Sequence, residues 1–178
     1  LVPASFLASL VSQYDGFLGQ LIKALFDIKP ELLNSSEKNI TYSQLLEFGS
    51  VEAAKEYLLE KEIETVLRKS HTEQFDWLEG KFVIELRKDL PSWPIVIELT
   101  ERRNLFVHTR GIVSSQYMKV CAQHKVKLAD DVKVGTQLFA GADYMTSAFA
   151  CIFEIGVKLA HVLWRKMQPE TRKEADES

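Results

Sequence analysis

Residues 101–117, with the sequence ERRNLFVHTRGIVSSQY, are the part of this chain that says most about its fold. The first part of this stretch has the pattern of a helix end, and Gly111 follows as a residue typical of a helix stop. A second run with helical spacing begins after the glycine. The stretch therefore predicts two successive helices, and it places Arg103, Asn104 and His108 near the end of the first.

The remainder of the chain also predicts helices. Glycine and proline are sparse, with 8 and 5 residues, and no stretch alternates apolar and polar residues for long enough to form a sheet. An ambiguous segment lies between the last two predicted helices. We expect helices at residues 5–27, 42–48, 51–69, from 72 onward, 95–109, 114–124 and 138–167. This pattern predicts an all-α, up-and-down bundle of four to five main helices.

Length and composition predict one domain with its own core. The chain has 178 residues, of which 46% are hydrophobic and 26% are charged. We assign residues 1–168 to this helical domain and expect the charged residues 169–178 to form a disordered tail. The chain does not begin with Met, which is compatible with a piece of a longer protein that carries further domains.

The sequence predicts neither export nor membrane insertion. The first three residues carry no basic segment of the kind that opens a signal peptide. The longest apolar region, around residues 144–153, is flanked by Asp143 and Glu154 and is shorter than the roughly 20 residues of a membrane span.

Cys121 and Cys151 are too scattered for a disulfide framework or a metal site, so we expect buried free thiols. A cytoplasmic protein with no metal, no cofactor and no membrane partner is predicted.

Charge is distributed unevenly along the chain. The net charge is -3, but residues 95–127 hold six basic and two acidic side chains, which gives this segment +4 and leaves -7 for the rest. A basic segment in an acidic protein has the sign needed to approach a phosphate backbone. A solvated helix face with ordinary charge scatter accounts for the same count equally well.

Arg103 and His108 match an R-x4-H pattern, with Asn104 directly after the arginine. With this pattern and its flanks, residues 95–117 resemble the HEPN superfamily (higher eukaryotes and prokaryotes nucleotide-binding). The resemblance implies a helical bundle, and many HEPN members are metal-independent ribonucleases that work as dimers. A toxin subset has a tyrosine two residues after the histidine. This chain has Arg110 there, so regulation through such a tyrosine is not expected.

The residue types of the motif suit metal-independent cleavage of RNA. The reaction needs groups that move protons at the 2′-hydroxyl and the leaving oxygen, and a positive group that stabilises the phosphorane. Histidine suits proton transfer because the unperturbed pKa of an imidazole lies near neutrality, so His108 is the candidate general acid or base. The arginine fork of Arg103 suits phosphate oxygens, and Asn104 can orient either partner. The predicted substrate contacts are Arg102, Arg110, Ser114 and Tyr117. Arg102 is alternatively a partner of Glu98, four residues before it.

Helix geometry opposes a site formed by Arg103 and His108 of one straight helix. Five residues at about 100° each place the two side chains about 140° apart. Either the last turn around His108 unwinds next to Gly111, or two copies of the chain complete a shared cleft across a two-fold axis. HEPN resemblance implies the second arrangement.

Three functions follow from these observations. The first is a homodimeric endoribonuclease, a toxin or phage-defence effector that acts on tRNA or other cellular RNA, with an antitoxin or a fused domain as a further partner. The second is a non-catalytic HEPN module for dimerisation or nucleotide sensing within a larger protein. The third is a helical adaptor unrelated to HEPN, in which Arg103 and His108 are only dipole partners at a helix end.

Overall fold

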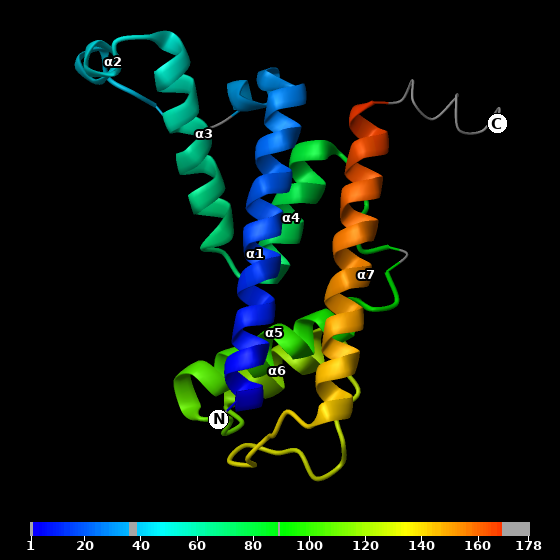
Figure 1. Ribbon diagram of the computed structural model, residues 1–178. Helices are drawn as coiled ribbons and strands as arrows, with labels where there is room; N and C mark the ends of the chain where they lie inside the picture. Colours follow the sequence, from blue (N-terminus) through cyan, green and yellow to red (C-terminus); the bar gives the residue numbers. More distant parts are fainter. Residues whose placement is uncertain (1, 36–38, 89, 169–178) are drawn as a thin grey trace, which may run out of the picture. The chain divides into compact units, whose positions relative to one another are not determined.

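The computed structural model describes residues 2–35, 39–88 and 90–168, and the secondary structure in these ranges is helical (Figure 1). The elements are α1 (Val2–Ile28), the 3-10 helix η1 (Pro30–Ser35), α2 (Tyr42–Phe48), α3 (Val51–Leu67), α4 (His71–Phe82), α5 (Trp93–Thr109), α6 (Ser115–Gln123) and α7 (Ala142–Met167). The all-α class is confirmed: seven α-helices and no strand occur in the part of the chain just named. An up-and-down bundle of the HEPN type stays a prediction.

The chain divides into two compact units. Unit 1 comprises Leu1–Gly16 and Glu85–Leu159, and unit 2 comprises Phe17–Ile84 and Ala160–Ser178. Each unit combines one segment from the first half of the sequence with one from the second half. Helices α1 and α7 are each divided between the two units. The predicted tail at 169–178 lies outside the described residues.

Helix caps in unit 2 explain where its helices begin. Thr41 and Gln44 form a reciprocal capping box at the start of α2, and Ser70 with Glu73 forms another at the start of α4. Ser50 accepts a hydrogen bond from the backbone N–H of Ala53 at 3.0 Å and so begins α3. These side chains satisfy backbone donors that the first helical turn leaves without partners.

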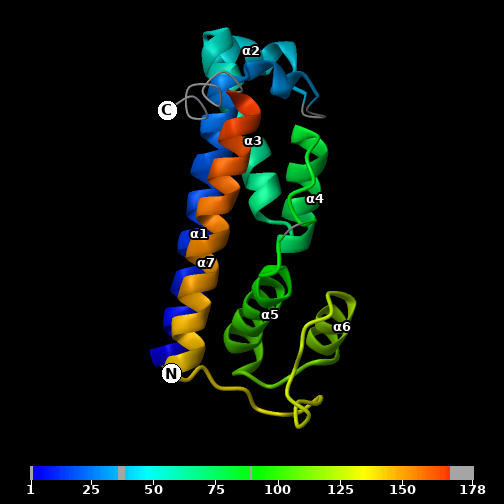
Figure 2. The ribbon, with the colours of Figure 1, turned by 90° about the vertical axis from the view of Figure 1, so that its right-hand side faces the viewer.

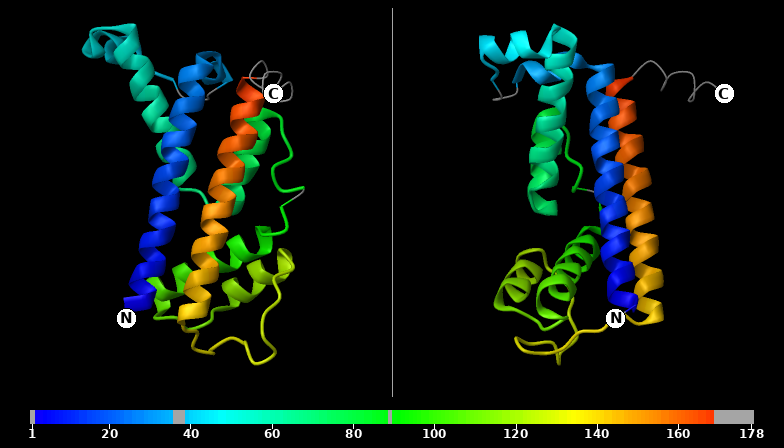
Figure 3. Two further views of the ribbon diagram at one scale, coloured as in Figure 1. Left: turned by 45° about the vertical axis from the view of Figure 1, so that its right-hand side comes forward. Right: turned by 60° about the vertical axis from the view of Figure 1, so that its left-hand side comes forward.

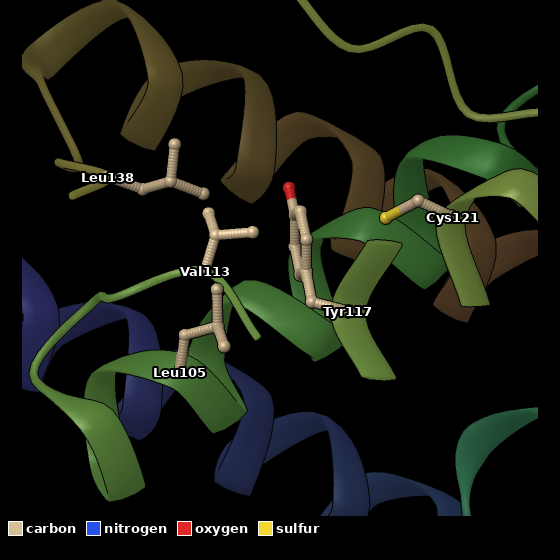
Figure 4. Packing of buried hydrophobic residues seen from close by; sticks show 5 residues of the cluster. All are labelled: Leu105, Val113, Tyr117, Cys121 and Leu138. Carbon is tan, nitrogen blue, oxygen red and sulfur yellow. The ribbon is translucent and has the colours of Figure 1, made fainter. Parts of the chain in front are cut away.

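Helices α5 and α6 form an antiparallel pair in unit 1, and the views in Figures 2 and 3 agree that they lie side by side. At one end, the indole Nε1 of Trp93 donates a hydrogen bond to His124 Nδ1 at 3.2 Å. Apolar side chains of both helices and of the loops next to them form a buried cluster (Figure 4). Its members are Leu105, Val113, Tyr117, Cys121 and Leu138.

The connection between α6 and α7 is longer than the sequence predicts, since α7 begins at Ala142 and not at residue 138. Besides local turns, its backbone forms hydrogen bonds with the segment after α5. The N–H of Leu138 donates to the carbonyl of Gly111 at 2.9 Å, and the N–H of Val113 donates to the carbonyl of Thr136 at 2.9 Å. These bonds join residues more than 20 positions apart, so helical periodicity cannot reveal them.

Helix α7 corrects the expectation that the apolar region near residues 144–153 is too short to cross a membrane. The helix has 26 residues and, among the described helices, is long and apolar enough to do so by length and composition. A third of its most apolar window is buried in the protein. A helix in the core of a folded domain passes the same test, so length and composition alone do not place α7 in a membrane.

Candidate functional site

The end of α5 is a regular helix terminus. Helical structure continues through Thr109, and Arg110 then adopts a left-handed conformation with φ of 57°. The backbone N–H groups of Arg110 and Gly111 both donate to the carbonyl of Leu105. The last turn therefore does not unwind around His108, and the first of the two ways to bring Arg103 and His108 together is absent from this structure.

Gly111 is required where α5 ends. Its φ is 86°, and a Cβ atom added there would lie 2.8 Å from the carbonyl oxygen of Leu138 and 3.0 Å from the ring of Phe106. A side chain at this position would collide with the backbone of the α6–α7 connection. The glycine thus permits the close approach that attaches this connection to the end of α5.

His108 is exposed in the last turn of α5. Within residues 2–35, 39–88 and 90–168, the structure records no hydrogen bond or ion pair for its imidazole. The position of His108 is fixed through the backbone of a continuous helix, while its ring is open to solvent. Such a group is available for proton exchange with a ligand.

Arg103 is directed toward helix α1. Its guanidinium lies 3.9 Å from the carboxylate of Asp15, and about a quarter of its side chain is exposed. Its Nε is buried and has no hydrogen-bond partner among the residues that the structure describes, which is energetically unfavourable for a donor of this kind. Because the helix is regular, Arg103 and His108 leave it about 140° apart. The structure does not bring the two together within one chain.

Asn104 and Glu101 lie on the same side of α5 as His108. Four residues separate Asn104 from His108 and seven separate Glu101 from it, so their directions differ from that of His108 by about 40° and about 20°. Asn104 and Glu101 are both half-buried. Of the predicted catalytic residues, Asn104 is therefore the one that shares a helix face with His108. Glu101 is an acidic group on that face, and the motif did not indicate it.

Arg102 pairs with Glu98, which is the second of the two interpretations that the sequence allowed. Its Nε donates to Glu98 Oε1 at 2.6 Å, and its Nη1 donates to the backbone carbonyl of Phe139 at 3.1 Å. The guanidinium also lies 4.1 Å from the centre of the Tyr144 ring. Only 15% of the Arg102 side chain is exposed, so in this structure Arg102 binds protein groups and not a ligand.

Tyr117 is fully buried, which corrects the expectation that it lines a substrate groove. Its hydroxyl donates to Glu98 Oε1 at 2.6 Å, and the hydroxyl of Tyr144 donates to Glu98 Oε2 at 2.9 Å. Burial and the nearby charge of Glu98 raise the pKa of both tyrosines far above its ordinary value. Both hydroxyls therefore stay protonated and keep donating.

The result is a buried carboxylate with three donors, which we call the Glu98 cluster: Glu98, Arg102, Tyr117 and Tyr144. Glu98 is 7% exposed. Burial lowers the pKa of Arg102, but the charge and hydrogen bond of Glu98 and the two nearby tyrosines together outweigh it and leave that pKa above its ordinary value. A buried charge is tolerated when it is paired and hydrogen-bonded, so the Glu98 cluster has the properties of a structural junction of α5, α6 and α7.

Ser114 and Arg110 occupy the loop between α5 and α6. The hydroxyl of Ser114 accepts a hydrogen bond from the backbone N–H of Tyr117 at 3.1 Å and so caps α6. The side chain of Arg110 is exposed, while its backbone carbonyl accepts a hydrogen bond from Gln137 Nε2 at 2.8 Å. Of the four predicted substrate contacts, Arg110 is the cation that remains accessible to a ligand.

Both thiols are buried and free, as the sequence predicts. Burial raises the pKa of Cys121 and of Cys151 to about 11, so both are protonated and unreactive at neutral pH. Within the described ranges, no group of three His, Cys, Asp or Glu side chains is placed to hold a metal ion.

Comparison with known proteins adds no family to this description. The chain matches no family model, no curated protein and no solved structure. The resemblance to HEPN proteins therefore depends on residues 95–117 and, with low specificity, on the helical pattern of most of the chain.

Proposed function

We propose that this protein is a metal-independent endoribonuclease, similar to HEPN ribonucleases, that acts as a homodimer. The observation that carries the proposal is His108, an exposed imidazole on a rigid helix end with no protein partner among the described residues. Asn104 lies on the same face, and the exposed cation Arg110 follows two residues later. Together they offer a proton-transfer group, an orienting amide and a positive charge.

A second copy of the chain would supply what one copy lacks. Arg103 leaves α5 about 140° away from His108, so Arg103 of one chain would meet His108 of the other across a two-fold axis. Helix α7 exposes apolar side chains suited to pairing, because Phe149, Phe153 and Val157 are 55%, 65% and 52% exposed and follow each other at intervals of four residues.

The biological setting is proposed from the resemblance. A homodimeric ribonuclease of this kind suits a toxin or phage-defence effector in the cytoplasm, with tRNA or another cellular RNA as substrate. An antitoxin or a fused domain would restrain it. Expression of the wild-type chain in cells is then expected to be harmful, and the His108→Ala variant harmless.

The direct test is incubation of the purified chain with total RNA in the presence of EDTA. We expect the wild type to cleave RNA and His108→Ala to have no detectable activity, because the proton-transfer group is lost. His161→Ala is a matched control, since His161 is an exposed histidine on α7 outside the motif, and it should cleave at the wild-type rate. Full activity of His108→Ala with an unchanged melting temperature would remove His108 from the mechanism.

A non-catalytic module for dimerisation or RNA sensing is the second candidate. The ion pair between Arg103 and Asp15 favours it, because a carboxylate already neutralises the arginine that would otherwise bind the scissile phosphate. This alternative predicts a dimer that binds RNA or nucleotides and leaves total RNA intact in the same assay. Cleavage by the wild type that depends on His108 would exclude it.

A further inference from the structure

The α6–α7 connection, which is hydrogen-bonded to the end of α5, exposes one aromatic ring. Phe139 is 75% exposed, although its neighbours Leu138 and Ala140 are each 8% exposed. The connection is the yellow segment that leads into α7 in Figure 1. A side chain of this size between two buried residues is anchored at its backbone and open to solvent at its ring.

The backbone beside Phe139 is held by hydrogen bonds to α5 and its terminus. Arg102 Nη1 donates to the carbonyl of Phe139 at 3.1 Å, and the N–H of Leu138 donates to the carbonyl of Gly111 at 2.9 Å. One residue earlier, Gln137 Nε2 donates to the carbonyl of Arg110 at 2.8 Å. Arg102 is itself held by Glu98. Because this backbone is already ordered, the protein loses little conformational entropy when a ligand covers the ring of Phe139.

The charges on this part of unit 1 are mostly positive. Five basic and two acidic residues lie between positions 110 and 141, a net charge of +3 in a chain of -3, and all seven are exposed. They are Arg110, Lys119, Lys125, Lys127, Lys133, Asp130 and Asp131. An apolar protein partner would cover the aromatic ring without any need for this charge, whereas a nucleic acid uses both.

We infer that Phe139 is a base-stacking residue and that the ligand of this surface is single-stranded RNA. An unpaired base stacks on the ring of Phe139, while neighbouring phosphates contact exposed cations such as Arg110. Bases inside a duplex are already stacked and do not offer their faces to a protein side chain. This inference rests on the proposed function, because it names the form of RNA that the site near His108 receives.

Binding of a fluorescein-labelled single-stranded oligoribonucleotide, measured by anisotropy in the His108→Ala background, tests the inference without cleavage. We expect Phe139→Ala to raise Kd about 5- to 150-fold, the range that loss of one base stack produces. Phe139→Trp retains an aromatic face and should bind at least as tightly as the parent. Phe6→Ala, which removes another exposed ring (56%) in unit 1, is the matched control and should leave Kd unchanged.

The outcomes separate this inference from the proposed function. Equal Kd values for Phe139→Ala and its parent, in a protein whose wild type cleaves RNA, would overturn the stacking role and leave the ribonuclease standing. Loss of binding with Phe139→Ala in a protein that never cleaves RNA would support stacking and exclude the ribonuclease. A similar loss of affinity for a duplex of the same sequence, or a change of oligomeric state on size exclusion, would overturn the inference.

Discussion

Glu98 shows how a single buried charge organises its surroundings. Its carboxylate receives Arg102 and Tyr117 on one oxygen and Tyr144 on the other. The pair with Arg102 follows from a spacing of four residues and was one of two interpretations of the sequence. Tyr144 lies 46 residues away, and no local pattern connects it with Glu98. The sequence thus indicated one of three donors, because the other two reach Glu98 through tertiary packing.

Replacement of Glu98 by glutamine is expected to destabilise the protein by about 3–5 kcal/mol, because Arg102 would remain as a buried charge without its counter-ion. The free energy of unfolding in urea measures the effect. Glu85→Gln is a matched control, since Glu85 pairs with Lys88 at the surface at 2.8 Å, and exposed pairs contribute about 0–1 kcal/mol. Equal stabilities of the two variants would show that the Glu98 cluster contributes no more than a surface ion pair.

At the scale of elements, the helices follow from local rules and the connections between them do not. Thr41, Ser50 and Ser70 accept backbone hydrogen bonds at the starts of α2, α3 and α4, and such residues are recognisable as caps in a sequence. Periodicity predicts the start of α7 four residues too early, because Leu138 N–H donates to Gly111 in the segment after α5 and the carbonyl of Phe139 accepts from Arg102, so neither joins the helix. The exposure of the Phe139 ring depends on the same long-range hydrogen bonds, so local periodicity does not predict it.

Substitution of Gly111 by alanine tests the contact between the α6–α7 connection and the end of α5. We expect a loss of more than about 1–3 kcal/mol in unfolding free energy, since the new methyl group combines a left-handed backbone with a contact of 2.8 Å to Leu138 O. Gly135→Ala has the same backbone strain with φ of 90° and open space around it. Chemical denaturation should therefore give Gly111→Ala a lower free energy of unfolding than Gly135→Ala. Equal losses of stability in the two variants would show that the close approach at Gly111 does not contribute.

On the scale of the whole molecule, composition predicts an α-helical globular protein, and the structure bears out the all-α class. The division into two units could not be predicted, because each unit is built from segments distant in sequence that no local pattern connects. The candidate site was predictable only in part. The sequence indicated His108 and Arg103, but the ion pair of Arg103 with Asp15 depends on a contact between residues 88 positions apart.

Association of two copies is a prediction at this scale. If α7 forms the interface, Phe153→Glu should convert a dimer into a monomer, because a charge would then face the apolar surface of the partner. Multi-angle light scattering after size exclusion measures the mass, and circular dichroism checks that the fold is kept. Val51→Glu, at an exposed apolar residue of α3 (54%), is the control that should leave the mass unchanged. A dimer that persists in Phe153→Glu would place the interface elsewhere.

The shared helices α1 and α7 have a consequence for how the chain can be divided. A break between α4 and α5 gives an N-terminal piece with residues 1–84 and a C-terminal piece with residues 85–178, and each piece holds one portion of either unit. Neither piece contains a complete core, so each needs the other to fold. We therefore expect the two halves of this polypeptide to suit fragment complementation, in which the native helical structure forms only when both are expressed in the same cell.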